Sequence, residues 1–290
     1  MALKERDEFS GQVTTGHEWN GIKELNTPVP RLVWAFLGTM ALFAVVWTIL
    51  MPSWPGINGY FRGLLGADQH QSVELTLAQA AADQARWTER LVNEDLATLQ
   101  ADADIMAVVR QASSSLFIDN CAACHGVEAT GNPGYPNIAE APMMWGGDAD
   151  TIAETIRVGI NATHPETRFA QMLAFGRDQM LAGAEVTLLA DYVASISHGP
   201  ALPTEQRLAA EELFANNCAG CHGETAKGMV ETGAPDLTDE YWTYAGDHAA
   251  IRRSIYNGRQ GTMPAWEGRL STAQIRMLAL YVLDLRSATP

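Results

Sequence analysis

The pentapeptides CAACH, at residues 121–125, and CAGCH, at residues 218–222, decide how this chain folds. Each lies in a longer repeated stretch, LFIDNCAACHG at 116–126 and LFANNCAGCHG at 213–223. These stretches hold all four cysteines of the 290-residue chain. A pattern that recurs after 97 residues indicates an internal duplication, and therefore two copies of one folding unit.

The repeat continues beyond the cysteines. GDADTI at 147–152 corresponds to GDHAAI at 246–251. Near the end of each copy, apolar residues recur at i, i+3, i+4, i+7 and i+10, which is typical of one face of an amphipathic helix. They are Val186, Leu189, Ala190, Val193 and Ile196 in the first copy, and Ile275, Leu278, Ala279, Val282 and Leu285 in the second. Ser271 and Gln274 match a capping box at the start of the second of these helices, and the first copy lacks that signal.

The sequence of each copy thus predicts four elements in order: a helix that leads into the cysteines, a long loop rich in Gly and Pro, a short helix and a closing helix. We place the two domains at 108–199 and 200–290, with a linker around 197–203. Units of roughly 90 residues with so much loop have a thin apolar core, so a large apolar group is expected to fill each one.

Cys-x-x-Cys-His is the attachment pattern of a c-type haem. The two thiols form thioethers with the haem vinyl groups, and the adjacent histidine reaches the iron from one side. The sequence therefore predicts two covalently bound haem c groups. The cysteines that would hold them are Cys121, Cys124, Cys218 and Cys221, and the axial histidines are His125 and His222.

Two other uses of the cysteines explain the pattern less well. A Cys₄ zinc cluster would not account for a histidine after each second cysteine. Redox cysteines of the thioredoxin type belong in a βαβ context, which is absent from the sequence pattern.

Methionines are the candidates for the second axial ligand. Met263 lies in GTMPAW (261–266) and Met172 in TRFAQMLAFG (167–176), so the two His-to-Met separations are 41 and 47 residues. Thioether ligation raises the haem potential, which suits an electron relay. The alternative is that these methionines fill gaps in the core, as some of the chain's 11 methionines must.

Three residues compete with Met172 as the ligand of its haem. Met143 and Met144 precede it, and His164 is the other histidine close enough in sequence. For His164 we expect a role in the loop or in packing.

Leu32 to Met51 form an apolar run of twenty uncharged residues, which as a helix would be about 30 Å long, the thickness of a bilayer core. Trp34 and Trp47 lie near its ends, where aromatic belts occur. Prolines bound the run on both sides. We therefore predict a transmembrane helix at 32–54.

Flanking charges predict how this helix is oriented. Residues 1–31 hold four Lys and Arg residues and residues 52–72 hold one, so the positive-inside rule leaves 1–31 in the cytoplasm and exports the remainder. A cleaved signal peptide is the alternative. The long N-terminal region, the length of the apolar run and the lack of an A-x-A site count against it.

Residues 55–107 form the exported spacer, and residues 73–112 mix alanines, leucines and charges at loosely helical spacing. They could be a packing arm with a solvated face or a segment that docks onto membrane partners. The chain carries a net charge of −15, which argues against nucleic-acid binding. Residues 52–290 carry 15 basic and 29 acidic side chains, and we expect this acidic surface to steer a cationic cytochrome c donor.

Taken together, these segments resemble subunit III, the dihaem subunit, of cbb3-type cytochrome c oxidases. The resemblance covers nearly the whole chain, and its most specific pieces are NEDLA at 93–97, WGGD at 145–148, RFAQM at 168–172 and MPAW at 263–266. It implies a mainly α fold, in which one N-terminal transmembrane helix precedes two tandem class I cytochrome c-like domains.

The resemblance also implies a function. Electrons would pass from a soluble or membrane cytochrome c donor through the two haems to the catalytic haem-copper subunit, which reduces dioxygen to water. It implies association with that subunit and with a monohaem cytochrome c subunit, in a bacterial inner membrane with the haem domains in the periplasm, and it favours docking for the spacer.

Two features of the family bear on the axial ligands. Members usually have Met-Pro in both domains, whereas Leu173 follows Met172 here. The distal methionines can be exchanged between the two haems, so the resemblance leaves their pairing open.

Other functions fit part of the pattern. A membrane-anchored dihaem cytochrome could serve a dehydrogenase or a denitrification enzyme. A dihaem peroxidase needs a vacant distal position, against which the two methionines argue. A purely structural, haem-free membrane anchor is a further alternative, which would require that no covalently bound haem is found on a denaturing gel. The chain shows no site of its own for reducing dioxygen.

Overall fold

The computed structural model describes residues 5–57 and 59–288. The chain divides into two compact units at Ala82/Asp83, a boundary that falls within α2 (Gln69–Asn93). The predicted mainly α fold is confirmed, since the described residues form eleven helices and only four short strands.

The first unit contains a small β-hairpin that was not predicted. Strands β1 (Thr14–Trp19) and β2 (Ile22–Leu25) pair antiparallel and are joined by Asn20 and Gly21, which both have positive φ, 48° and 84°. Positive φ at both central residues is the signature of a type I′ turn, for which Asn-Gly is the preferred dipeptide. The signal was therefore present in the sequence.

Helix α1 (Arg31–Leu50) is the predicted membrane helix. It has a mean hydropathy of 2.1 and none of its apolar window is buried within the protein. The hydroxyls of Thr39 and Thr48 donate to the carbonyls of Ala35 and Ala44, at 2.9 and 2.7 Å. These bonds matter in hydrocarbon, where an unpaired hydroxyl would be costly.

The chain turns back on itself after α1. The helix ends at Leu50, before the predicted limit of the span at residue 54, and the short strands β3 (Pro55–Gly56) and β4 (Gly59–Tyr60) follow. The N–H groups of Leu64 and Leu65 then donate to carbonyls of the last turn of α1, at 3.0 and 3.1 Å. This return satisfies helix-terminal carbonyls that would otherwise lack partners.

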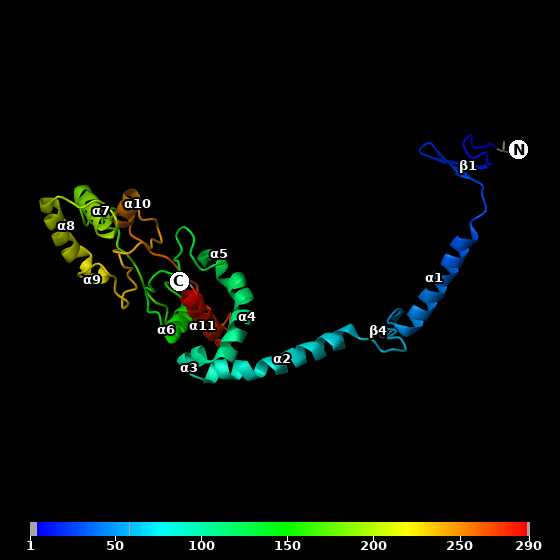
Figure 1. The fold of residues 1–290 in the computed structure, drawn as a ribbon, viewed down its shortest axis with the longest axis horizontal. Coiled ribbons are helices and arrows are strands. Elements are labelled where there is room, and N and C mark those ends of the chain that lie inside the picture. The colour runs from blue at the N-terminus through cyan, green and yellow to red at the C-terminus, as the bar shows by residue number, and fades with distance from the viewer. Residues whose placement is uncertain (1–4, 58, 289–290) are drawn as a thin grey trace. The chain divides into compact units, whose positions relative to one another are not determined.

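The second unit consists of two helical bundles (Figure 1). The first bundle comprises α3 (Leu96–Ala101), α4 (Ala103–Asn120), α5 (Ala122–His125), α6 (Ala149–Val158) and α11 (Thr272–Ala288). The second bundle comprises α7 (Gly183–Ser197), α8 (Thr204–Asn217), α9 (Ala219–His222) and α10 (His248–Asn257).

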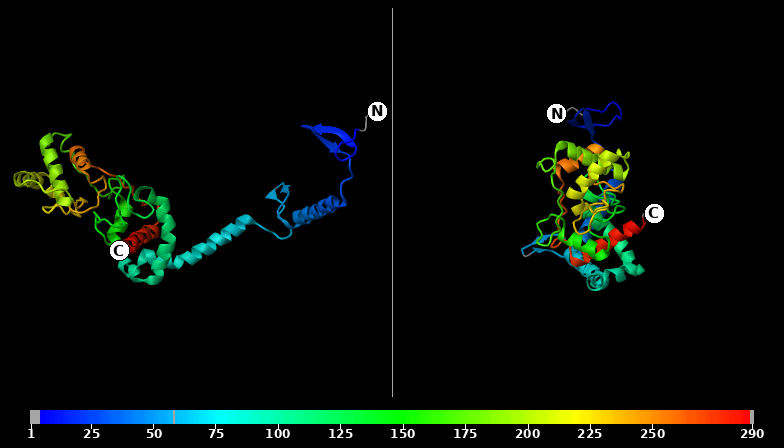
Figure 2. Two further views of the ribbon diagram at one scale, coloured as in Figure 1. Left: turned by 45° about the horizontal axis from the view of Figure 1, so that its top comes forward. Right: turned by 90° about the vertical axis from the view of Figure 1, so that its left-hand side faces the viewer.

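The two closing helices are exchanged relative to the sequence repeats. Helix α11, which ends the second repeat, packs on α4 and α6 of the first, and Figures 1 and 2 both show it, in red, beside α4. Helix α7, which ends the first repeat, packs on α8 and α10 of the second. Each bundle therefore combines elements from both halves of the duplicated sequence.

The same aromatic contact holds each closing helix in place. Tyr281 of α11 meets Phe117 of α4, with ring centroids 5.8 Å apart, and Tyr192 of α7 meets Phe214 of α8 at 5.6 Å. The two tyrosines occupy equivalent positions of the repeats, and so do the two phenylalanines. Each bundle therefore has the same aromatic contact, although its closing helix comes from the other repeat. The predicted capping box of α11 is also present, since Ser271 and Gln274 exchange two hydrogen bonds.

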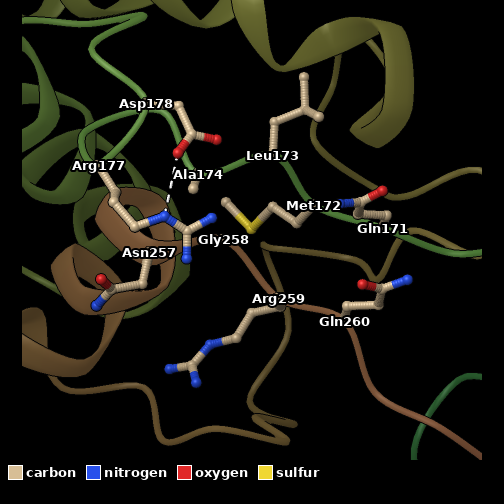
Figure 3. Close-up of a pocket in the computed structure, with 10 residues that line it drawn as sticks. All are labelled: Gln171, Met172, Leu173, Ala174, Arg177, Asp178, Asn257, Gly258, Arg259 and Gln260. Carbon is tan, nitrogen blue, oxygen red and sulfur yellow. Dashed lines mark hydrogen bonds and ion pairs between the residues drawn. The ribbon is translucent and has the colours of Figure 1, made fainter.

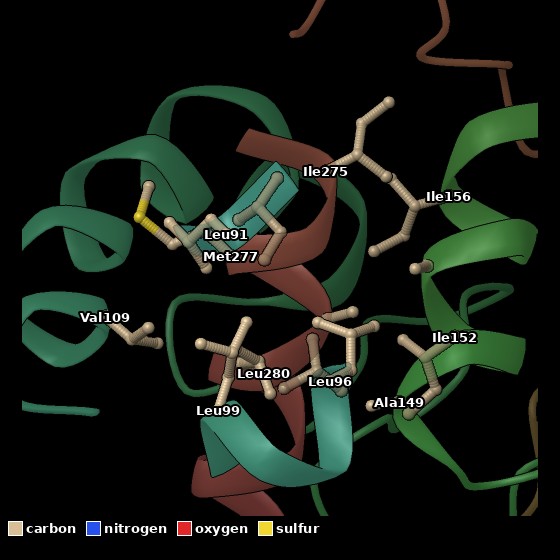
Figure 4. Close-up of a cluster of buried hydrophobic side chains, with 14 of the residues drawn as sticks. Leu91, Leu96, Leu99, Val109, Ala149, Ile152, Ile156, Ile275, Met277 and Leu280 are labelled. Atoms are coloured by element: carbon tan, nitrogen blue, oxygen red, sulfur yellow. The ribbon is translucent and has the colours of Figure 1, made fainter. Parts of the chain in front are cut away.

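The core of the first bundle begins before residue 108, where the first domain was expected to start. Leu91, Leu96 and Leu99 are fully buried in it. Figure 4 shows Leu280 of α11 lying with Leu96 and Leu99, while Ile275 faces Ile156 of α6. The carbonyl of Leu91 also accepts a hydrogen bond from Arg276 Nε at 2.5 Å. This part of the spacer is therefore a packing arm.

Candidate haem-binding sites

The two Cys-x-x-Cys-His sequences form single helical turns at equivalent places in the bundles. Helix α5 runs from Ala122 to His125 and α9 from Ala219 to His222. In both turns the N–H of the second cysteine and that of the histidine donate to the carbonyl of the first cysteine, at 2.9–3.1 Å. This winding places two thiols and one imidazole on a short turn, as attachment to one planar ring requires.

A proline carbonyl orients each histidine. Nδ1 of His125 lies 3.1 Å from the carbonyl oxygen of Pro136, and Nδ1 of His222 lies 3.0 Å from that of Pro235. A carbonyl only accepts, so Nδ1 carries the proton and Nε2 is left as the free donor of an electron pair to a metal. Sequence reasoning missed these prolines, although GYP at 134–136 and GAP at 233–235 repeat, with the proline 11 residues after His125 and 13 residues after His222.

Burial shifts the pKa of titratable groups at both sites. Burial lowers the pKa of His125 and of His222, which favours the neutral imidazole that binds iron. Burial also raises the pKa of the Cys121 and Cys218 thiols to about 11.

Each candidate methionine packs in the bundle that contains the cysteines of the other repeat. Met263 packs against the core of the first bundle, which also contacts Cys121 and Ala122. Met172 packs against the core of the second bundle, together with Cys218 and Ala219. The methionine loops have therefore been exchanged along with the closing helices that follow them.

Backbone pairing fixes the two methionine loops. The N–H and carbonyl of Met263 bond to those of Ile160, both at 2.9 Å, and Met172 pairs with Arg259 in the same way at 2.8 and 3.1 Å. Asn161 adds a side-chain link, since its Nδ2 donates to the carbonyls of Ala170 and Gly261, each at 2.7 Å. The two loops thus meet in one seam between the bundles.

Of the competing residues, Met143 packs beside the first bundle, as Met263 does, whereas His164 is bound elsewhere. Together with Met144, Met143 lines a cavity of about 760 Å³ between the loops 130–144 and 227–245. His164 is bound to a carboxylate, with its Nε2 2.6 Å from Oε2 of Glu267. Glu267 also pairs with Arg157 at 3.1 Å, so His164 is hydrogen-bonded within a polar network on the loop.

A smaller cavity of about 230 Å³ adjoins Met172 (Figure 3). The loop 171–174 and residues 257–260 line it, and Arg177 pairs with Asp178 at 3.0 Å on its other side. In Figure 3 the sulfur of Met172 is drawn between the side chains of Arg177 and Leu173. The cavity therefore marks the contact between the Met172 loop and the end of α10.

These residues fit haem c better than they fit zinc. Within residues 5–57 and 59–288, no group of three or more His, Cys, Asp and Glu side chains is placed to hold a metal ion. Each bundle instead offers two thiols, one oriented histidine with a free Nε2, and one thioether. One guanidinium nitrogen, Nε of Arg168, is buried and has no hydrogen-bond partner among the described residues.

Comparisons with protein families match three parts of the chain. Residues 11–58 match the N-terminal domain of cytochrome oxidase-cbb3, FixP. Residues 111–197 match the cytochrome c family, and residues 205–282 match cytochrome c oxidase, cbb3-type, subunit III.

Curated relatives match nearly the full length. The chain is 42% identical over 281 residues to the cbb3-type cytochrome c oxidase subunit FixP of Bradyrhizobium sp. (strain ORS 278), with 97% of each chain covered. It is 39% identical over 291 residues to the subunit CcoP of Cereibacter sphaeroides, covering 98% of this chain and 99% of the relative. It is 41% identical to CcoP of Rhodobacter capsulatus, with 94% and 95% covered.

Proposed function

The chain belongs to the subunit III family of cbb3-type cytochrome c oxidases, and we propose that it transfers electrons through two haem c groups whose methionine ligands are exchanged between its bundles. It is a membrane-anchored electron-transfer subunit with cytochrome c domains, and it works within the oxidase complex. The resemblance noted in the sequence is confirmed, and the relatives favour the oxidase over other respiratory enzymes.

Each proposed site draws on both sequence repeats. The first haem would be attached to Cys121 and Cys124, with His125 and Met263 as the ligands of its iron. The second would be attached to Cys218 and Cys221, with His222 and Met172 as the ligands of its iron. The single observation that carries this pairing is the packing of each methionine with the cysteines of the other repeat.

Haem c supplies a one-electron iron couple when bound. The chain's own residues provide a fixed environment for that couple. The proline carbonyls orient the histidines, and the backbone hydrogen bonds of the two methionine loops keep the methionine side chains in position. A site with both axial positions filled by protein has no open position for peroxide, which favours electron transfer over peroxidase chemistry.

Leu173, which replaces the family's usual proline, leaves the loop in place. A Cβ on Gly258 would lie 2.4 Å from the carbonyl oxygen of Met172, and one on Gly159 would lie 2.4 Å from that of Met263. The two methionines therefore have the same backbone relation to the helix end beside them. This equivalence supports Met172 as the counterpart of Met263.

The partners and orientation belong to the same proposal. The N-terminal tail lies in the cytoplasm and residues 55–290 lie in the periplasm, because Lys and Arg are concentrated in residues 1–31. Electrons enter from a soluble or membrane cytochrome c and leave toward the catalytic haem-copper subunit. The monohaem cytochrome c subunit is the other partner within the oxidase.

Replacing the two methionines one at a time tests the pairing. In oxidised protein, Met263→His should abolish the methionine-to-iron charge-transfer band of the haem attached at Cys121, and Met172→His that of the haem attached at Cys218. The haems are told apart by attaching only one, in Cys121→Ala/Cys124→Ala or Cys218→Ala/Cys221→Ala protein. Loss of the band from the haem of the same repeat would contradict the exchange, and Met144→His is the matched control.

A further inference from the structure

An arginine precedes each candidate ligand by four residues. Arg168 stands four residues before Met172 and Arg259 stands four before Met263, so the two loops share the pattern Arg-x-x-x-Met. The surrounding residues differ between the loops. The two arginines have equivalent surroundings in the structure. Each arginine lies in one bundle, and the methionine four residues later packs in the other bundle.

Arg168 lies with the first bundle. Its guanidinium carbon is 5.1 Å from the centre of the Trp145 ring, and its Nη2 reaches the carbonyl of Thr151, on α6, at 3.4 Å. Its backbone N–H donates to the carbonyl of Gly159, at the end of α6, at 3.1 Å. Met172, four residues later, packs in the second bundle.

Arg259 mirrors this arrangement in the second bundle. Its guanidinium carbon is 4.1 Å from the centre of the Tyr244 ring, and its Nε donates to Ser254 Oγ, on α10, at 2.9 Å. Tyr244 stands three residues before Asp247, which caps α10, just as Trp145 stands three before Asp148, which caps α6. Met263 packs in the first bundle.

Neither guanidinium has a carboxylate partner within the described residues. Arg90, Arg110 and Arg157 all form ion pairs, whereas Arg168 and Arg259 form none in that part of the chain. Both side chains are partly buried, and Nε of Arg168 is buried without any partner. Burying a cation without a partner is costly, and the planar fork of arginine is shaped for a carboxylate.

We propose that each Arg-x-x-x-Met segment serves both haems, holding the propionate carboxylates of one with its arginine while its methionine binds the iron of the other. Arg168 then pairs with the propionates of the haem attached at Cys121, and Arg259 with those of the haem attached at Cys218. This rests on the two-haem ligand set proposed above. The propionates supply the missing anions, and the aromatic rings hold each guanidinium in place.

The consequence for electron transfer is electrostatic. A guanidinium beside the propionates offsets their negative charge. Its positive charge disfavours ferric iron relative to ferrous iron, and so raises the reduction potential of the haem. Each five-residue segment also ties the charge at one haem to the ligand at the other, so a movement of either loop alters both sites.

Arg168→Gln tests this assignment by redox titration of the two haems in the intact membrane protein. We expect it to lower the reduced-to-oxidised ratio of one haem about tenfold at a given potential, or 59 mV, because the positive charge that offsets the propionates is lost. The affected haem should be the one whose methionine band disappears in Met263→His. Its potential should also rise as the pH falls, because the unpaired propionate becomes easier to protonate.

Arg168→Lys keeps the charge and should restore most of the potential. Arg269→Gln is the matched control, because Arg269 also stacks on a tryptophan, with its guanidinium carbon 4.2 Å from the ring centre of Trp266, but is exposed. If the Arg168→Gln protein does not incorporate haem, Arg259→Gln provides the same test for the haem attached at Cys218.

The outcomes separate this inference from the one on which it rests. Absence of both methionine bands from unmodified protein would refute the ligand set itself. With the bands present, an unchanged potential in Arg168→Gln would refute the propionate contact. An equal shift in Arg269→Gln, or a shift confined to the haem served by Met172, would refute the crossed arrangement.

Discussion

Two glycines fix where the loops of the two candidate methionine ligands lie. Gly159 and Gly258 end α6 and α10 with φ of +69° and +68°, a backbone region that side chains rarely adopt. Each also lies directly against a methionine loop, so that a Cβ would overlap the methionine's carbonyl oxygen. These positions need glycine both for conformation and for space.

Gly159→Ala should therefore displace the Met263 loop. We expect a loss of about 1–3 kcal/mol in the free energy of unfolding, the usual cost of a strained backbone position. The methionine charge-transfer band of the haem attached at Cys121 should weaken, and thermal melts with optical spectra would measure both effects. Gly183→Ala, at the start of α7 with nothing within 4 Å of the added carbon, is the control. Equal effects from the two variants would show that the close approach is unimportant.

Helices α7 and α11 show how the exchange operates at the scale of elements. They carry the same apolar spacing, and each presents a tyrosine to the equivalent phenylalanine of a bundle. Only residues 198–203 separate α7 from α8, and such a short connection favours antiparallel packing of the two helices. With α7 committed to the second bundle, α11 is the helix that covers α4 and α6.

The equivalent leucines Leu278 of α11 and Leu189 of α7 provide a test of the exchange. Both are buried, at 1% and 0% exposure, so replacing either by alanine should cost about 2–5 kcal/mol of unfolding free energy. We expect Leu278→Ala to lower the denaturant concentration at which the haem attached at Cys121 loses half of its methionine charge-transfer band. Leu189→Ala should do the same for the haem attached at Cys218. Leu208→Ala, at an exposed position of α8, is the control. The reverse assignment would mean that the helices stay with their own repeats.

Charge is the property that matters most for function at the scale of the whole molecule. The 290 residues carry 34 acidic and 19 basic side chains, and most of the excess lies after the membrane helix. Opposite charges raise the rate of encounter between two redox proteins, and salt screens that effect. An acidic electron acceptor is therefore suited to a cationic donor.

Reduction of this subunit by a cationic cytochrome c should slow markedly as ionic strength rises from about 10 to 200 mM. Stopped-flow absorbance with the assembled complex would measure the rate constant, and a neutral small-molecule reductant would serve as the control. The slope of the rate against ionic strength should be negative for the cytochrome and near zero for the small reductant. A rate that is independent of salt would contradict electrostatic steering.

Local patterns were sufficient for several predictions, because the interactions involved are close in sequence. The membrane helix follows from twenty uncharged residues, and the capping box of α11 from two residues three apart. The hairpin at Asn20-Gly21 could have been found in the same way. The proline carbonyls that orient the histidines are harder to recognise, because a backbone acceptor leaves little trace in side-chain chemistry.

The sequence alone was sufficient to predict two Cys-x-x-Cys-His turns, two matching sets of helices and one apolar anchor, because each depends on spacing within a short segment. It left undecided which closing helix and which methionine completes which bundle. The repeats give both helices the same apolar face, so either would satisfy either core. Only the tertiary structure decides between them, through the short link from α7 to α8 and the backbone pairing of Met172 with Arg259 and of Met263 with Ile160.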